Sequence, residues 1–396
     1  MLRHLRRHAR RNGILLSLAL LIWGANTFWL TPAELAQTPQ TPDHAACLSC
    51  HKQIVQSHLH TAHWLSSSAA SAATIKGSFR NGRNRFVYND KLEVVMEKKN
   101  GIWLQSSYFN GNLFEAEAFD IVIGSARKGQ TYLYWDNNRL FQLPISYYTP
   151  ADAWCNSPGY PTNLAYYSKQ VPGQCMECHA TAAELFTDDH GSVTYDKNSL
   201  ILGIDCQRCH SDATQHIAWH TAHPADSLQG RYIVDARHLS RQQRLDACAL
   251  CHSGFRKQFT PSFTFRVGDT LDKFSTAVYD SAAAANAELD VHGNQYGLLT
   301  SSKCFIRSGN LDCSSCHNVH VDEAGKMAVF SQRCISCHNP LPPHPGQDST
   351  RLAANCIDCH MPALPSNKIL LQLTAGASPV HDLVRTHHIA IYPKAK

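Results

Sequence analysis

The sequence is poor in methionine and, beyond its N-terminus, in clustered positive charge. Only 5 of its 396 residues are Met, so thioether sulfur is a scarce metal ligand in this chain. The formal net charge is +5, but five Arg and a single Glu lie in residues 1–36, which leaves the rest of the chain nearly neutral. Nucleic-acid binding needs a clustered basic face. We therefore exclude nucleic acid as a partner.

Cysteine, in contrast, is frequent and regularly placed. Fourteen of the sixteen cysteines fall in seven copies of the motif C-x-x-C-H. Two thiols at this spacing bond the two vinyl groups of one haem, and the following His places an imidazole on the iron. The motif residues are Cys47, Cys50 and His51; Cys175, Cys178 and His179; Cys206, Cys209 and His210; Cys248, Cys251 and His252; Cys313, Cys316 and His317; Cys334, Cys337 and His338; and Cys356, Cys359 and His360. The sequence therefore predicts seven covalently bound haem c groups.

Zinc is the alternative use of paired cysteines, because C-x-x-C also builds zinc ribbons. Zinc sites do not require a His directly after the second Cys, and all seven pairs have one, so we favour haem. Cys155 and Cys304 remain outside the motifs. For these two a disulfide, inert buried thiols and a reactive site all stay open.

The first 36 residues have the pattern of an export segment. Five Arg precede an uncharged, largely apolar run from Gly13 to Leu30, as in a signal peptide. No clean cleavage site follows, and the run is near the lower length limit for crossing a bilayer, so an uncleaved membrane anchor is the alternative. In both cases we expect the haem-bearing part to be periplasmic or otherwise extracytoplasmic.

The number of haems also shapes the expected fold. After Ala46, 350 residues remain for seven haems, and porphyrin faces would supply much of the buried apolar surface. We therefore predict a mainly α fold with short helices and much irregular structure, organised around a haem stack, including a helix over Cys47–Ser67. The expected divisions are the export segment (1–36), a first haem segment (37–74), a small antiparallel β insertion (75–150) and a six-haem segment (151–396).

The β insertion is predicted from alternating apolar residues and from hairpin turns. Asn-Gly pairs, which favour tight hairpins, begin at positions 81, 100 and 110. For its aromatic residues we favour packing over a binding surface. The expected strands are 85–88, 92–98, 102–107, 113–119, 121–123, 131–135 and 140–143, and the aromatics are Tyr132, Tyr134, Trp135, Tyr147, Tyr148 and Trp154.

The second axial ligand of each iron is expected to be His. Fifteen further His follow the export segment, whereas Met96 and Met327 are the realistic Met candidates. Because Met ligation raises the potential of a haem, bis-His ligation predicts low-potential haems.

Four segments resemble the multihaem cytochromes c related to the nitrifier tetrahaem cytochrome and hydroxylamine oxidoreductase. They are Cys47–His63 with its Thr61-Ala-His63 ending; Cys206–His216, with Ser211-Asp-Ala in place of the usual Gly-Pro-Gly; Asp290–His292 with Ser302–Phe305 and Cys313–His320; and Cys356–Pro362 with Arg385-Thr-His387-His388-Ile. The resemblance covers about two thirds of the chain. It implies His63, His216, His292, His320 and His387 as distal ligands, with His388 nearly equal to His387. A second rank holds His60, His220, His223, His344 and His381.

The leading functional hypothesis is electron transfer by a heptahaem cytochrome c. Its partners would be extracytoplasmic redox proteins, such as a quinol-side donor and a terminal reductase or acceptor. The alternative is an oxidoreductase of a small nitrogen or sulfur compound, with one haem that has an open axial position. For that role we single out the fourth haem, at Cys248, Cys251 and His252, whose only nearby distal candidate is His238. A third hypothesis is a filament in which one His binds a neighbouring subunit's haem.

Overall fold

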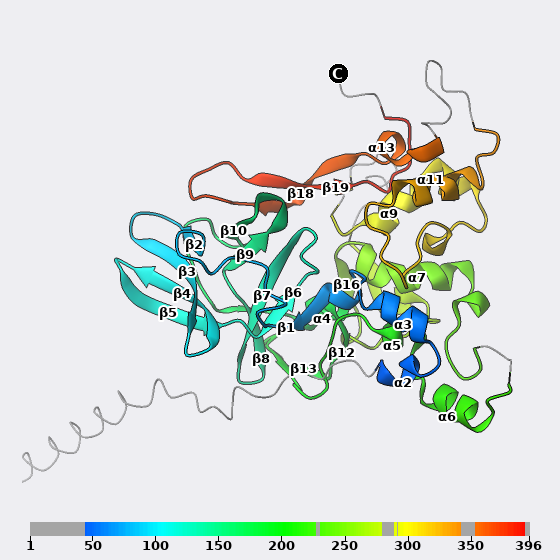
Figure 1. Cartoon of the computed structure of the whole chain (residues 1–396), viewed down its shortest axis with the longest axis horizontal. Helices are drawn as coiled ribbons and strands as arrows, with labels where there is room; N and C mark the ends of the chain where they lie inside the picture. The colour runs from blue at the N-terminus through cyan, green and yellow to red at the C-terminus, as the bar shows by residue number, and fades with distance from the viewer. Residues whose placement is uncertain (1–43, 227–229, 279–288, 291, 342–352, 393–396) are drawn as a thin grey trace, which may run out of the picture. The chain divides into compact units, whose positions relative to one another are not determined.

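The computed structural model describes residues 44–226, 230–278, 289–290, 292–341 and 353–392 (Figure 1). The expected export segment and His344 lie outside these residues. No helix among the described residues is both long enough and apolar enough to cross a membrane.

The expectation of a mainly α fold is wrong. About 26% of the described residues are helical and about 27% are in strands. The helices are short because a haem motif needs little more than one helical turn, and α7 (Arg241–His252), at 12 residues, is the longest that the structure describes. Strands also continue well beyond residue 150. One long hairpin, β18 (Ala363–Leu371) with β19 (Val380–Arg385), follows the last motif.

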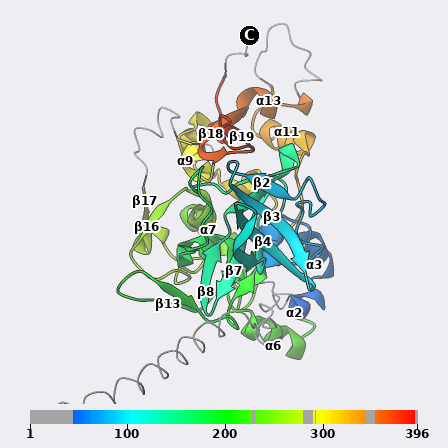
Figure 2. The same cartoon turned by 90° about the vertical axis from the view of Figure 1, so that its left-hand side faces the viewer.

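A four-stranded antiparallel sheet forms the centre of the expected β insertion. Its order is β2 (Arg85–Val87), β3 (Leu92–Lys99), β4 (Ile102–Phe109) and β5 (Asn112–Ala118), and Figure 2 shows β2, β3 and β4 side by side. Asn100-Gly101 and Asn110-Gly111 make the two tight turns, and all four residues have positive φ. This is the backbone that Asn-Gly hairpins require. Alternate residues of β3 are buried, and Met96 among them packs in the core, so it is no longer an axial candidate.

A seven-stranded sheet lies next along the chain. Its main path runs β1 (Ser67–Ala69), β6 (Ile121–Ile123), β7 (Gly129–Asp136), β8 (Arg139–Gln142) and β11 (Lys169–Gln170). Two further strands branch from this path: β9 (Ile145–Tyr148) pairs with β7, and β10 (Ala153–Asn156) pairs with β9. Four strands of this sheet, β1, β9, β10 and β11, were not anticipated from the sequence.

Aromatic side chains fill the core shared by these strands, as the sequence predicts. Tyr132 is fully buried and Trp154 is 4% exposed, with their ring centres 5.7 Å apart. Tyr134, Tyr147 and Tyr148 are also buried. These aromatics therefore stabilise the fold by packing rather than by lining a binding surface.

The haem motifs lie on short helices with small two-stranded sheets between them. Cys47–Ser67 is not one helix, because α3 ends at His58 and a separate 3₁₀ turn follows. The helices are α2 (Ala45–Leu48), α3 (Lys52–His58), α4 (Gly173–His179), α5 (Cys206–His210), α6 (Thr214–Ala222), α9 (Gln295–Thr300), α10 (Lys303–Arg307), α11 (Met327–Ile335) and α13 (Ile357–His360); the 3₁₀ turns are η1 (Trp64–Ser66), η2 (Thr149–Ala151), η3 (Ala236–His238), η4 (Leu271–Lys273) and η5 (Cys313–Ser315). The two-stranded antiparallel sheets are β12 (Ala180–Ala182) with β15 (Ile201–Leu202), β13 (Leu185–Thr187) with β14 (Val193–Tyr195), and β16 (Arg256–Gln258) with β17 (Ser275–Ala277).

Candidate functional site

Each C-x-x-C-H motif occupies one turn of helix. The backbone N–H of His51, for example, donates to the Cys47 carbonyl at 2.8 Å, and His317 N–H donates to the Cys313 carbonyl at 2.9 Å. The motifs of Cys175, Cys206 and Cys248 lie within α4, α5 and α7. Residues four apart lie on the same face of a helix. The first Cys and the His of a motif are therefore on one side, as attachment to a single haem requires.

Four motif imidazoles each face a second imidazole from a distant segment. The ring centres are 6.0–6.3 Å apart in all four cases. The pairs are His51 with His216, His210 with His320, His252 with His63, and His317 with His387.

This spacing fits one metal ion between each pair of rings. Two imidazoles bound on opposite sides of a metal, each through a metal–nitrogen bond of about 2 Å, hold their ring centres about 6 Å apart. Rings in direct contact can come closer: those of His216 and His220 are 4.6 Å apart. The paired residues therefore fit haem iron with two axial His.

Hydrogen bonds orient two of these rings. Nδ1 of His210 lies 2.8 Å from the Val234 carbonyl, and Nδ1 of His216 lies 2.8 Å from the Arg231 carbonyl. A ring that donates its Nδ1–H to a carbonyl keeps Nε2 available to a metal, and such partners fix the orientation of metal-binding His. His210 and His216 belong to two different facing pairs.

Burial favours the neutral form of several of the facing imidazoles. It lowers the pKa of His63 and of His387 to about 4, with a smaller contribution from neighbouring His in each case. The pKa values of His252, His317 and His320 are also lowered, mainly by burial. Neutral imidazole is the form that binds a metal.

The other His residues considered from the sequence lie elsewhere. His292 lies near Asp290, Asp382 and Lys128, with no described imidazole at the 6 Å spacing. Nδ1 of His388 is 3.2 Å from the Tyr392 hydroxyl, whereas its neighbour His387 faces His317. In the second rank, His60 is exposed, His220 contacts His216, His223 stacks on Trp219, and Nδ1 of His381 lies 2.8 Å from the Ser366 carbonyl.

The fourth motif has a facing His that the sequence did not assign to it. His252 faces His63, so the fourth motif, singled out above for an open axial position, has a second imidazole that could serve as a sixth ligand of a haem iron. His238 is exposed and lies 4.0 Å from Asp235. Within the described residues, no second imidazole lies at the 6 Å spacing from His179 of the second motif.

Cysteines of different motifs contact one another. Side-chain hydrogen bonds join Cys206 to Cys47, Cys251 to Cys178, and Cys248 to Cys313. Weaker electrostatic contacts link further motifs: Cys209 with Cys251, Cys316 with Cys337, and Cys334 with Cys356. Neighbouring attachment sites therefore lie next to each other in space.

The two cysteines outside the motifs are free and do not form a disulfide. Cys155 is fully buried beside Tyr148 and Leu371, and burial raises the pKa of its thiol to about 12. Cys304 is partly exposed and lies close enough to Cys337 and Cys316 to interact electrostatically.

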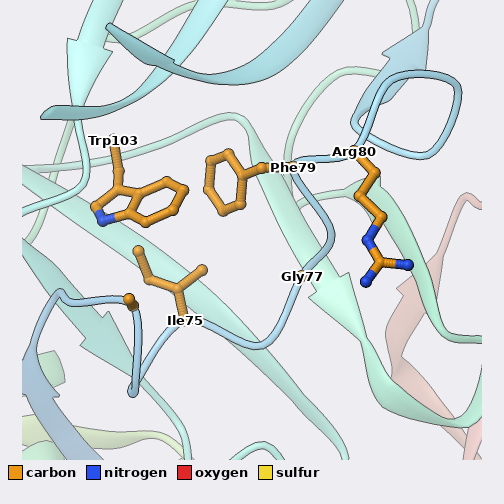
Figure 3. Close-up of a pocket in the computed structure, with 6 residues that line it drawn as sticks. Ile75, Gly77, Phe79, Arg80 and Trp103 are labelled. Carbon is orange, nitrogen blue, oxygen red and sulfur yellow. The ribbon is translucent and has the colours of Figure 1, made fainter. Parts of the chain in front are cut away.

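A cavity of about 570 Å³ lies in the β region, outside the motifs. It is lined by Ala72, Ile75, Gly77, Phe79, Arg80 and Trp103. Figure 3 shows Trp103, Phe79 and Ile75 gathered together, with the Arg80 side chain apart from them. None of these residues belongs to a haem motif or to a facing His pair, so the cavity is separate from the candidate haem centres.

Comparisons with known proteins agree with these features. Residues 162–211, which contain the second and third motifs, match the family model of cytochrome c554 and c-prime. No curated protein matches the chain. The crystal structure of outer cell wall cytochrome OcwA matches with a TM-score of 0.54 and 15% sequence identity, over 88% of this chain and 79% of that chain. At this identity the match shows the fold. Together with the motifs, these findings support a multihaem c-type cytochrome with covalently attached haem.

Proposed function

We propose that this multihaem c-type cytochrome carries seven haems and transfers electrons between extracytoplasmic redox partners. The observation that carries the proposal is the set of four facing imidazole pairs at 6.0–6.3 Å. An iron with two axial His has no open position for a substrate, so it exchanges electrons rather than transforming a bound molecule. The haem supplies the redox chemistry, and the chain supplies ligation, spacing and electrostatics.

The contacts between motif cysteines support a continuous series of haem sites. The hydrogen-bonded thiols place the first motif beside the third, the second beside the fourth, and the fourth beside the fifth. The Cys209–Cys251 interaction joins the third motif to the fourth, and Cys316–Cys337 and Cys334–Cys356 join the fifth, sixth and seventh. On this basis the first motif is linked through the third, fourth, fifth and sixth to the seventh, with the second beside the fourth, and electrons pass along this series.

An extracytoplasmic location follows from the export pattern of residues 1–36 and is in keeping with the similarity to an outer cell wall cytochrome. A quinol-side donor and a terminal reductase or acceptor are the partner classes that such a carrier would connect.

The second candidate function is an oxidoreductase of a small nitrogen or sulfur compound. The observation that favours it is at His179, which has no described imidazole at the 6 Å spacing, in contrast to His252. His338 of the sixth motif likewise has no described imidazole at this spacing, so the second and sixth motifs replace the fourth as candidates for an open axial position.

Voltammetry of the protein adsorbed on an electrode separates the two functions. We expect reversible exchange of about seven electrons per molecule at low potential, with the same response in the presence of nitrite or hydroxylamine. A catalytic current with either compound would overturn the carrier proposal and favour the oxidoreductase.

A further inference from the structure

A buried ion pair joins the second and third haem motifs. Glu177 lies between the two cysteines of the second motif, and Arg208 lies between those of the third. Arg208 Nη2 is 3.8 Å from Glu177 Oε1, and it donates to the Glu177 backbone carbonyl at 3.1 Å. The Arg208 side chain is 8% exposed and the Glu177 side chain is 5% exposed. No other ion pair in the described part of the chain has both side chains below 10% exposure.

The surrounding chain holds this pair in a defined position. Gln258 Nε2 donates to Glu177 Oε2 at 2.6 Å, and the Phe263 backbone N–H donates to Glu177 Oε1 at 2.8 Å. The Arg208 guanidinium also lies over the Phe263 ring, 5.4 Å from its centre. Both carboxylate oxygens are therefore partnered, as a buried charge requires.

Stability alone is a poor reason for burying this pair. Removing two charges from water costs several kcal/mol per ion, and apolar residues of similar volume often stabilise a protein as well or better. The chain thus places two opposite charges where packing would not require them.

The location of the pair indicates another role. Glu177 directly precedes Cys178 of the second motif in the chain, and Arg208 directly precedes Cys209 of the third. The Cys178 thiol in turn donates to the carbonyl oxygen of Leu250, inside the fourth motif, at 3.9 Å. The second, third and fourth motifs therefore meet around this pair, where the proposed electron path branches.

We propose that the Glu177–Arg208 pair sets the reduction potentials of the haems held by the second, third and fourth motifs. The inference rests on the proposed function, because it requires haem at these motifs. Each electron that arrives at an iron lowers the charge there by one. A fixed guanidinium favours this arrival and a fixed carboxylate opposes it, and burial strengthens both effects.

Spectroelectrochemical titration of the haem-loaded protein tests this role in three variants. Arg208→Gln lowers the midpoint potentials of a subset of the haems, because a positive charge is lost. Glu177→Gln raises the potentials of the same subset, because a negative charge is lost. Arg208→Lys keeps the charge and leaves the potentials close to those of the wild type.

The exposed pair Arg85–Glu93, whose charged atoms are 3.0 Å apart on β2 and β3, provides the matched control. Arg85→Gln changes the net charge by the same amount as Arg208→Gln and leaves the potentials unmoved. Equal potentials in Arg208→Gln and Arg85→Gln, or shifts of the same sign in Arg208→Gln and Glu177→Gln, would overturn the inference.

Haem content, measured by the pyridine haemochrome method on the same samples, separates this inference from the proposed function. Wild-type protein without haem at the motifs would contradict the proposed function itself. Fully loaded variants with unmoved potentials would contradict the role of Glu177 and Arg208 alone.

Discussion

The imidazoles of His63 and His252 face each other with their ring centres 6.1 Å apart and their planes crossed at 72°. The other three facing pairs have planes within 17–25° of parallel. His63 follows the first motif and His252 closes the fourth, so this contact joins distant parts of the chain. It also gives the fourth haem a second axial ligand in the proposed arrangement.

Replacing His63 tests that arrangement. In His63→Ala we expect about one haem equivalent to change from low-spin to high-spin ferric iron, because one iron loses its second axial ligand. Electron paramagnetic resonance of the oxidised protein measures the change. His60→Ala is the control, because the His60 side chain is exposed. Arg127 donates to the backbone carbonyl of His60, and the substitution leaves that carbonyl in place. An unchanged spin state in His63→Ala would show that His63 is not a ligand.

The crossed planes of His63 and His252 predict a distinct resonance in the wild type. Crossed axial imidazoles give a low-spin ferric signal with a large maximum g value, whereas near-parallel planes give an ordinary rhombic signal. We expect a large-g signal that disappears in His63→Ala and persists in His387→Ala, which belongs to a near-parallel pair. Loss of the large-g signal in His387→Ala instead would contradict the assignment.

Glu117, in strand β5, makes the free energy of unfolding depend on pH. Burial, together with Glu115, Asp120 and Asp136, raises its pKa to about 7. A carboxyl whose pKa is raised by folding destabilises the folded state when it is ionised. This destabilisation is present above pH 7 and disappears as the pH falls toward 4.5, the ordinary pKa of the carboxyl. Glu117→Gln should therefore increase the free energy of unfolding at pH 8 by about 1–3 kcal/mol, with a much smaller gain at pH 5.

Denaturant unfolding at the two pH values measures this difference. The control Glu93→Gln removes a carboxyl that is paired with Arg85 at the surface, and we expect little stabilisation from it at either pH. Equal effects of Glu117→Gln at pH 5 and pH 8 would refute the linkage.

Gly77 is required by the packing of Trp154. A Cβ at this position would lie 2.1 Å from Trp154 Cζ2, in the middle of the aromatic core. We expect Gly77→Ala to destabilise the protein by about 1–3 kcal/mol, the usual cost of overpacking. Gly309→Ala is the control, because a Cβ there meets nothing within 4 Å. Equal melting temperatures for the two variants would contradict the packing described for Trp154.

Alkylation counts the cysteines that are not bound to haem. In the folded protein we expect an alkylating reagent to modify Cys304 alone, because Cys155 is fully buried and the pKa of its thiol is about 12. After unfolding, both should react, while the fourteen motif cysteines stay protected as thioethers. Intact-mass measurement gives the count, and more than two modified thiols in the unfolded protein would show that a motif lacks haem.

The sequence was informative about which His residues lie opposite a motif His and less so about their pairing. Of the five His that the family resemblance named, the structure brings His63, His216, His320 and His387 opposite a motif His, whereas His292 has no described imidazole at that spacing; their binding to iron stays a prediction. The partners could not be read from the sequence, because each facing pair is closed by long-range folding. His63, for example, follows the first motif but faces the fourth.

The strands that the sequence missed are the short or irregular ones. The Asn-Gly pairs at 100 and 110 marked the hairpins of the four-stranded sheet, and those turns are present. By contrast, β18 contains Pro365, and its pairing with β19 is interrupted between Pro365 and Leu370. Proline and irregular register weaken the alternating pattern by which strands are recognised.

Crystals of the haem-loaded protein, measured at the iron absorption edge, test the central claim most directly. We expect seven iron peaks in the anomalous map, with one between the imidazoles of each of the pairs His51–His216, His210–His320, His252–His63 and His317–His387. Fewer than seven peaks, or iron bound by different His residues at these four positions, would contradict the proposed ligation.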